Sequence, residues 1–440
     1  MTYGVKGAFG ACAIAVTLSG CLSDMGNGWV ADNIVSRTRF ADPLAPGRKT
    51  HSEEVNAESQ IIQGLAARRS ALPPGSSFDQ VAKAVLAANS RTAEAELRAA
   101  RLRSEAASKN WLPRIGPDIS LTSLGSVVAN LVVDQVLFDN GRKKGEREFA
   151  IADVEVAAVT LAVDTNDRVH TGLTLYVTAA EAREKAVLSE AALRDMGHFE
   201  YVMGERVRGG VSDMSDLNIL RQKLAEIRAT QTANAELART SLAELNAMAI
   251  QPVSDLRGIP ELAVSAGTAQ PLPVVLAEAE KTRSIARAKV ERAGQLPGLS
   301  AGGTVGDGTN VGLRVTSDSL IGFGTGATLK AIEAAKETAA RRVAQAQEDS
   351  ARSLRKLESQ IAAKSRQATE AARLTAQARG NLDLFQQQYD AGQRQVMDVV
   401  GVYETFARQQ QAEVSLKYEV VRLRLDMARL LGVLADGDQI

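Results

Sequence analysis

The stretch "YDAGQRQVMDVV", residues 389–400, interrupts a long run of helix-forming sequence near the end of the chain. Residues 298–440 contain no proline, and they are rich in Ala, Leu, Glu, Gln and Arg, which favour helices. Gly392 can adopt a positive φ, the conformation that commonly ends a helix. We therefore expect two long helices, 325–390 and 395–434, joined by a turn that reverses the chain.

An earlier part of the chain repeats this pattern, which indicates an internal duplication. The stretch "VRGGVSDMSDLNIL" (207–220) contains a matching glycine, Gly210, and begins an a/d heptad pattern over residues 217–248. A second heptad pattern over 399–430 lies 182 residues later, position for position. Each repeat is expected to contain a helix, two strands, a long helix, a turn and a last helix. The expected elements are helix 79–110, strands 117–124 and 127–138, and helices 141–206 and 213–249 in the first repeat, then helix 273–294, strands 299–306 and 309–316, and helices 325–390 and 395–434 in the second.

The expected strands form two short hairpins, although their alternation of polar and apolar residues is poor. Gly125-Ser126 and Asp307-Gly308 supply the turns. Four strands cannot close a barrel, and an open edge in lipid leaves unpaired backbone groups. If the hairpins enter a membrane, several chains must therefore share one barrel. Eight strands from a dimer are nearly filled by side chains, whereas twelve from a trimer leave a lumen.

The N-terminus, "MTYGVKGAFGACAIAVTLSGC", has the features of a signal peptide. Lys6 precedes an apolar run that is too short to span a bilayer as a mature helix. The run ends at Cys21 in a sequence that resembles the lipobox of bacterial lipoproteins, in which the cysteine is lipidated. Leu22 is not the Asp that retains enterobacterial lipoproteins at the inner membrane, so the outer membrane is the expected destination. The alternative is an ordinary buried cysteine after an apolar segment.

Composition argues against several classes of function. Lys plus Arg and Asp plus Glu both number 52, so the net charge gives no sign of a nucleic-acid partner. Only three histidines occur, no two within a helical turn, and only two cysteines, so we expect no metal site. The glycine-rich stretch 303–312 lacks the Lys-Ser/Thr of a phosphate-binding loop. We expect no enzyme and no cofactor, since no catalytic Ser/His/Asp or Cys/His arrangement is found.

Residues 133–159, "VDQVLFDNGRKKGEREFAIADVEVAAV", resemble the strand-to-helix signature of the TolC-like outer-membrane efflux proteins, with Val136 in place of a proline and Asn140 in place of a glycine. The turns at 207–220 and 389–400 resemble the two periplasmic turns of that family. The resemblance covers residues 75–434. It implies a mainly α fold with a small β part, in which long coiled-coil helices form an α-barrel and the protomers of a trimer share a short transmembrane β-barrel.

This resemblance implies a domain order and a function. The order is signal peptide 1–20, lipidated equatorial extension 21–74, first repeat 75–250, equatorial linker 251–272, second repeat 273–434 and C-terminal tail 435–440. The expected function is the exit duct of a tripartite efflux pump or of a type I secretion system. Its partners would be a periplasmic adaptor (membrane fusion protein), an inner-membrane transporter of RND or ABC type, and outer-membrane lipid. Drugs, metal ions and secreted proteins all stay open as cargo.

The two alternative functions are a lipid-anchored periplasmic adaptor and a structural coiled-coil lipoprotein. A lipid-anchored periplasmic adaptor usually carries one coiled-coil hairpin, and the duplication argues against it. A structural coiled-coil lipoprotein is disfavoured by strands at matching places in both repeats.

The resemblance also assigns site residues. Asp216, Tyr389 and Arg394 match positions whose polar links close the periplasmic gate, and Gly210 and Gly392 are the tip turns. Asp398 matches an acidic residue at the pore constriction, although Gly401 stands where the family often has a second acid. The alternatives are that the gate residues are solvated turn residues and that Asp398 merely favours a helix N-terminus.

The lipobox gives the first testable prediction. Cys21→Ser removes the thiol that would be acylated, so the variant should not be labelled by a palmitate analogue in cells and should stay at precursor length. Cys12→Ser is the matched control, because Cys12 would leave with the signal peptide. Normal labelling of the Cys21 variant would contradict the lipobox assignment.

Overall fold

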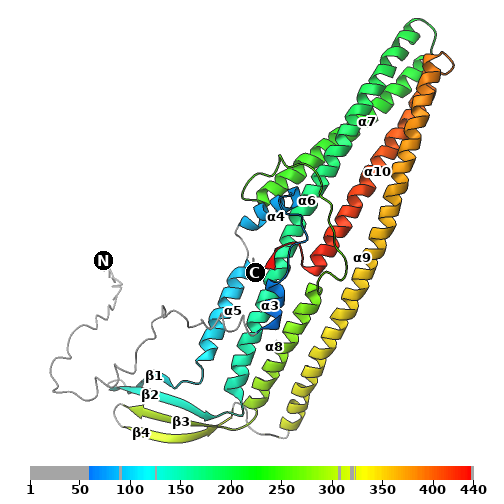
Figure 1. Cartoon of the computed structure of the whole chain (residues 1–440). Coiled ribbons are helices and arrows are strands. Elements are labelled where there is room, and N and C mark those ends of the chain that lie inside the picture. Colours follow the sequence, from blue (N-terminus) through cyan, green and yellow to red (C-terminus); the bar gives the residue numbers. More distant parts are fainter. Residues whose placement is uncertain are drawn as a thin grey trace, which may run out of the picture. The chain divides into compact units, whose positions relative to one another are not determined.

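Two long helical hairpins and one four-stranded sheet make up most of the structure (Figure 1). The computed structural model describes residues 59–88, 92–123, 126–305, 309–317, 322 and 324–437. Cys21 and the other residues before 59 lie outside this description. The elements are α3 (Gln60–Ala66), α4 (Ser77–Ala87), α5 (Thr92–Ser108), β1 (Arg114–Ser123), β2 (Ser126–Phe138), α6 (Arg142–Arg208), α7 (Met214–Met248), α8 (Leu272–Gly294), β3 (Gly298–Val305), β4 (Asn310–Thr316), α9 (Thr325–Asp390) and α10 (Val396–Leu431).

The order of elements is the same in both halves of the chain. A helix (α5 or α8) leads to a β-hairpin, which leads to a helical hairpin, α6–α7 or α9–α10. The helix expected over 79–110 is wrong in one respect, because two helices, α4 and α5, occupy that range. Ala88 has ψ of 89°, outside the helical region, and therefore ends α4. In the sequence Asn and Ser come next, and both residue types have a lower helix propensity than Ala. Positions 89–91 themselves lie outside the described residues.

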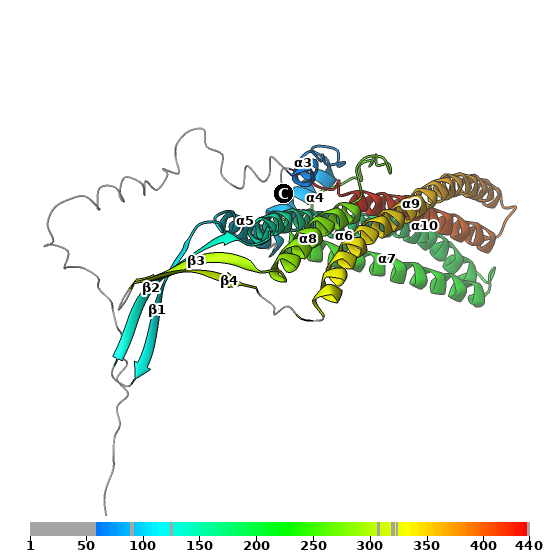
Figure 2. The ribbon, with the colours of Figure 1, turned by 90° about the horizontal axis from the view of Figure 1, so that it is seen from below.

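The two β-hairpins pair with each other. The strand order is β1-β2-β3-β4 and every pair is antiparallel, so β2 of the first repeat lies beside β3 of the second. The outer strands, β1 and β4, each have one neighbour among the described residues. Figure 2 shows the sheet at one end of the helices.

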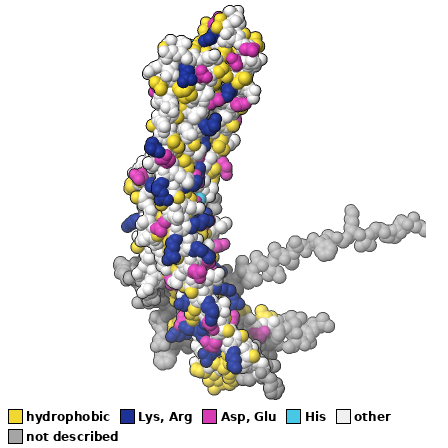
Figure 3. All heavy atoms as spheres, turned by 90° about the vertical axis from the view of Figure 1, so that its right-hand side faces the viewer, with side chains coloured by type: hydrophobic (Ala, Val, Ile, Leu, Met, Phe, Trp, Pro, Cys, Tyr) yellow, Lys and Arg dark blue, Asp and Glu magenta, His cyan; other side chains and the backbone are white. Residues whose placement is uncertain are grey.

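The two faces of this sheet differ in polarity. Residues paired across strands share a face, and successive residues alternate between faces. One row across the sheet reads Ile115, Val133, Gly303 and Val311, and Leu313 and Val315 lie on the same face of β4. Val311, Leu313 and Val315 are 78%, 71% and 70% exposed in the protomer. Figure 3 shows hydrophobic side chains gathered at this end of the molecule.

The opposite face of the sheet is polar or carries glycine at most positions, and its register explains why the alternation is poor in the sequence. Val132 and Val136 fall among its polar positions, and Gly302 and Gly312 leave gaps in it. Its polar members are Arg114, Asp118, Asn130, Asp134, Ser300, Thr304, Asn310, Arg314 and Thr316. The sheet is therefore amphipathic as a whole even though no single strand alternates cleanly.

Helix α6 lies at the centre of the helical layer. It contacts α5, α7, α8 and α10 along its 67 residues, whereas α9 contacts α8 and α10. Small side chains allow this close packing. A Cβ at Gly172 would lie 2.9 Å from Cγ2 of Val85 in α4, so the glycine permits α4 to approach α6. None of the helices that the structure describes is long and apolar enough to cross a membrane.

The segment before α4 fastens the C-terminus to the linker between the repeats. Arg68 donates from Nη1 to the Leu431 carbonyl at 2.5 Å and from Nη2 to the Gln270 carbonyl at 2.8 Å. The amide of Ala71 donates to the Val433 carbonyl at 2.8 Å. Burial lowers the pKa of Arg68 from its ordinary value. Arg68 therefore joins the N-terminal segment, the linker and the end of α10.

The linker between the repeats is also packed against the helices. Val253 and Leu262 are buried, and the hydroxyl of Tyr176 in α6 donates to the Gly258 carbonyl at 2.9 Å. The polar composition of this segment alone would indicate a disordered linker. A few apolar side chains and bonded carbonyls order it instead.

The fastening role of Arg68 is testable by Arg68→Met. Methionine keeps much of the side-chain volume but leaves two carbonyls without their donor, which should lower the free energy of unfolding by about 1–3 kcal/mol. The matched control is Arg69→Met, because Arg69 is exposed. Thermal denaturation measures both, and equal stability of the two variants would contradict the role.

Candidate functional site: the helical tip and the seam between the hairpins

Both helical hairpins reverse through the same turn. Gly210 follows α6 with φ of +72°, and Gly392 follows α9 with φ of +76°. The amides of Gly392 and Gln393 donate to the carbonyls of Tyr389 and Gln388, both at 2.8 Å. Gly210 and Val211 make the equivalent bonds to Val207 and Arg206. This is the Schellman arrangement, in which a residue with positive φ satisfies the last carbonyls of a helix.

The three predicted gate residues lie at this tip but are not joined within the protomer. Arg394 donates from Nε to Oε1 of Gln388 at 3.0 Å, and its guanidinium lies 4.4 Å from the centre of the Phe385 ring. Both contacts stay within the α9–α10 hairpin. Asp216 is half-buried in the first turn of α7. Among the described residues no hydrogen bond joins Asp216 to Tyr389 or Arg394, so their link remains a prediction.

Tyr389 contacts the other hairpin through its ring rather than its hydroxyl. Its ring centre lies 6.4 Å from that of Phe199 in α6, edge to face at 86°. Phe199 is buried in an apolar cluster that includes Met196, Leu220 and Val399. The hairpins are therefore held together at the tip by an apolar contact in which Tyr389 takes part.

Asp398 caps α10. Its Oδ2 accepts from the backbone amide of Gln395 at 3.1 Å, and the Gln395 side chain accepts in return from the Asp398 amide. This reciprocal capping satisfies amides that lack partners at a helix start. The side chain is otherwise exposed. Within the protomer Asp398 therefore acts as a capping residue of α10. A role in a pore would require other copies of the chain.

The seam between the two hairpins contains polar residues that the heptad pattern did not predict. Besides the face of α10 that packs on α9, a second face packs on α6. It repeats every three or four residues and mixes apolar with bonding side chains. Its contacts with α6 are Arg429–Asp167 at 2.6 Å, Asp426–His170 at 2.7 Å, Arg422–Glu181 at 2.7 Å, Tyr418–Glu184 at 2.8 Å, Lys417–Glu184 at 3.1 Å and Gln411–Ser189 at 3.2 Å.

Nearer the tip, two further contacts cross the seam. The Tyr403 hydroxyl in α10 donates to Oδ2 of Asp195 in α6 at 2.7 Å, and Lys223 of α7 pairs with Glu404 of α10. Burial, followed by the hydrogen bond to Asp195, raises the pKa of Tyr403 above its ordinary value, so the hydroxyl stays a donor at neutral pH. Tyrosines at 403 and 418, opposite acidic residues of α6, were the available sequence signal for this seam.

Comparison with solved structures relates this arrangement to known proteins. A membrane protein from Pseudomonas aeruginosa has a TM-score of 0.70 at 15% identity, over 82% of this chain and 91% of that one. The CmeC outer membrane channel of Campylobacter jejuni has a TM-score of 0.67 at 12% identity, over 82% of this chain and 86% of that one. The outer membrane protein VceC of Vibrio cholerae has a TM-score of 0.67 at 14% identity, over 86% of this chain and 96% of that one.

The chain has the fold of the TolC-like outer-membrane channels. No protein-family model matches the sequence, and no curated protein sequence matches it. At this level of identity the likeness concerns the fold alone. It assigns no role to any residue of the site.

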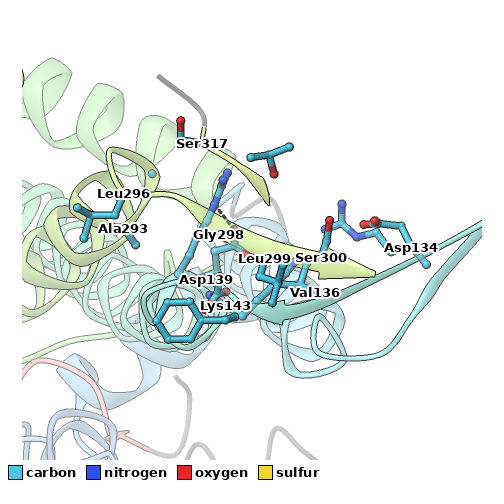
Figure 4. Close-up of a pocket in the computed structure, with 16 residues that line it drawn as sticks. Asp134, Val136, Asp139, Lys143, Ala293, Leu296, Gly298, Leu299, Ser300 and Ser317 are labelled. Atoms are coloured by element: carbon cyan, nitrogen blue, oxygen red, sulfur yellow. Dashed lines mark hydrogen bonds and ion pairs between the residues drawn. The ribbon is translucent and has the colours of Figure 1, made fainter. Parts of the chain in front are cut away.

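A cavity of about 210 Å³ lies where the sheet meets the start of α6 and the end of α8 (Figure 4). Its charged lining residues are balanced in sign: Arg114, Arg142, Lys143, Asp134, Asp139 and Glu146. Asp139 accepts from the amides of Gly141 and Lys143, and Glu146 pairs with Arg142 at 3.2 Å. Asp139 therefore caps the first turn of α6, and Glu146 braces it from the next turn. In the described part of the chain, no three His, Cys, Asp or Glu side chains are grouped as a metal site requires.

The tip turn gives a prediction about local stability. Gly392→Ala places a Cβ in open space but at φ of +76°, which should cost about 1–2 kcal/mol. Gly401→Ala, in the interior of α10 and also in open space, should instead stabilise by about 0.5–1 kcal/mol. Hydrogen exchange of the amides around each glycine measures both. Equal effects of the two substitutions would show that the left-handed turn is not required.

Proposed function

We propose that the chain is one subunit of a homotrimeric outer-membrane channel-tunnel, the exit duct of a tripartite efflux pump or of a type I secretion system. The observation that carries this proposal is the amphipathic sheet, whose outer strands each have one neighbour among the described residues, in a chain with the fold of outer-membrane channels. The polar face with Arg114, Asp134 and Arg314 suits a water-filled lumen. The apolar face suits lipid.

The helical layer also supports a closed ring of subunits, because helices at its two edges have exposed faces. Packing among the described helices places α7 on one side of α6 and α10 on the other, with α9 beyond α10. The outer faces of α7 and α9 are exposed in the protomer. A surface at one edge that fits a different surface at the other edge forms a ring when the rotation closes. Contact of α7 with α9 of the next subunit would produce the α-barrel.

The gate and the constriction belong to this proposal. Asp216 would link to Tyr389 and Arg394 across hairpins when neighbouring subunits are in place, since a carboxylate accepts from a phenol and a guanidinium at once. Asp398 uses one oxygen for capping, which leaves the carboxylate charge to face its copies around the axis. Three such charges in a narrow, poorly solvated passage attract cations.

The remaining parts complete the assembly. A lipid on Cys21 would anchor the subunit in the outer membrane, with the helices extending into the periplasm. A periplasmic adaptor and an inner-membrane transporter of RND or ABC type would supply the connection and the energy. The amphipathic sheet disfavours a purely structural coiled-coil lipoprotein, and two helical hairpins disfavour an adaptor.

Planar-bilayer recordings test the function. The purified wild-type protein should form cation-selective channels, and Asp398→Asn should lower the selectivity for cations while the amide oxygen still caps α10. Folding should change little, which circular dichroism checks. Absence of channels from well-folded protein would contradict the duct, whereas unchanged selectivity would leave Asp398 as a capping residue alone.

A further inference from the structure

The seam between the hairpins is uneven along its length. From Arg429 to Gln411, α10 is bonded to α6 by the six contacts given above, about one at every turn. On the tip side of Gln411, the described residues provide only Tyr403–Asp195 and Lys223–Glu404 as polar contacts between hairpins. Beyond Tyr403 the described contacts between hairpins are apolar, as between Tyr389 and Phe199.

This distribution defines where the hairpins can separate. Parting them on the sheet side of Gln411 would break several ion pairs together, one of them to Glu181, whose side chain is only 12% exposed. Parting the hairpins on the tip side of Gln411 breaks one hydrogen bond, Tyr403–Asp195, and one ion pair, Lys223–Glu404. It also exposes the apolar cluster around Phe199. The tip segment is therefore the part of the seam that can open while the rest stays closed.

We propose that the tip latch, defined as Tyr403–Asp195 together with Lys223–Glu404, limits how far the two hairpins part and that opening pivots next to Gln411. The proposal rests on the channel function above, and it adds positioning residues that are distinct from Asp216, Tyr389 and Arg394. The latch joins α10 to both helices of the first hairpin, α6 and α7. It thereby fixes α10 in two directions one to two turns from Asp398.

The chemistry of the latch suits a reversible link. Tyr403 is 6% exposed, whereas Asp195 is exposed, so water can replace the hydroxyl when the bond breaks. Lys223 and Glu404 are each 27% exposed, which leaves both charges partly solvated in either state. Neither break creates a fully buried, unpaired charge, which is the costly outcome for a polar contact.

The test combines two substitutions that remove the latch without changing its volume, Tyr403→Phe and Glu404→Gln. The matched control is Tyr418→Phe, which removes a tyrosine hydroxyl from Glu184 in the densely bonded part of the same seam. Spin labels at Tyr201→Cys and Leu384→Cys, exposed positions on α6 and α9, report the distance between hairpins near the tip. The chain has only two other cysteines, Cys12 and Cys21, and they precede the described residues.

The latch variant should raise the population at the longer label distance at least about tenfold, because loss of the Tyr403–Asp195 bond alone has about that effect and the charge of Glu404 is lost as well. In bilayers its open probability should rise by the same factor, and Tyr418→Phe should change neither measurement. An unchanged distance in the latch variant would overturn the proposal, and so would an equal change in the control. Channels absent from wild-type protein would contradict the duct alone, because the label distance still decides the latch.

Discussion

The outer edges of β1 and β4, which have no neighbour among the described residues, are the constraint on which the rest of the structure depends. The duplication brings β2 and β3 together, which completes the middle of the sheet, and within the described part of the chain β1 and β4 each keep one open edge. An open edge is tolerated in water but is costly in a hydrocarbon environment, where each unpaired group costs several kcal/mol. If the sheet lies in a membrane, as the proposed function requires, other copies of the chain would have to complete it.

The long helices are held together by their packing around α6. α6 is enclosed by α5, α7, α8 and α10, and this central packing aligns the two repeats. Apolar packing alone would allow α10 to shift along α6. The ion pairs of the seam between these helices favour one register. Arg422 with Glu181 and Lys417 with Glu184 fix the register of α10 along α6. The bonds become sparse towards the tip, which is the segment where the proposed opening would take place.

Local sequence patterns predicted much of this fold. Gly392 and Gly210 identified the turns because only glycine adopts a positive φ without strain, and the helix expected over 325–390 has the limits of α9. The break at Ala88 was missed because no proline or glycine marks it. Pairing of β2 with β3 was not predicted either, since it joins residues 161 to 174 positions apart, from Phe138↔Leu299 to Leu131↔Val305, and leaves no local pattern. The second face of α10 was missed because it mixes tyrosine and charged residues with apolar ones, and its partners on α6 are known only from the fold.

In the proposed trimer, Asp216 and Asp398 would act on side chains of neighbouring copies, which the sequence of one chain does not place. The number of copies is thus the quantity that tests the account most directly. Native mass spectrometry of the protein, extracted from outer membranes in mild detergent, measures it. The account predicts a complex of three subunits, which supplies twelve strands and leaves no open edge. A stable monomer in the membrane extract would contradict it.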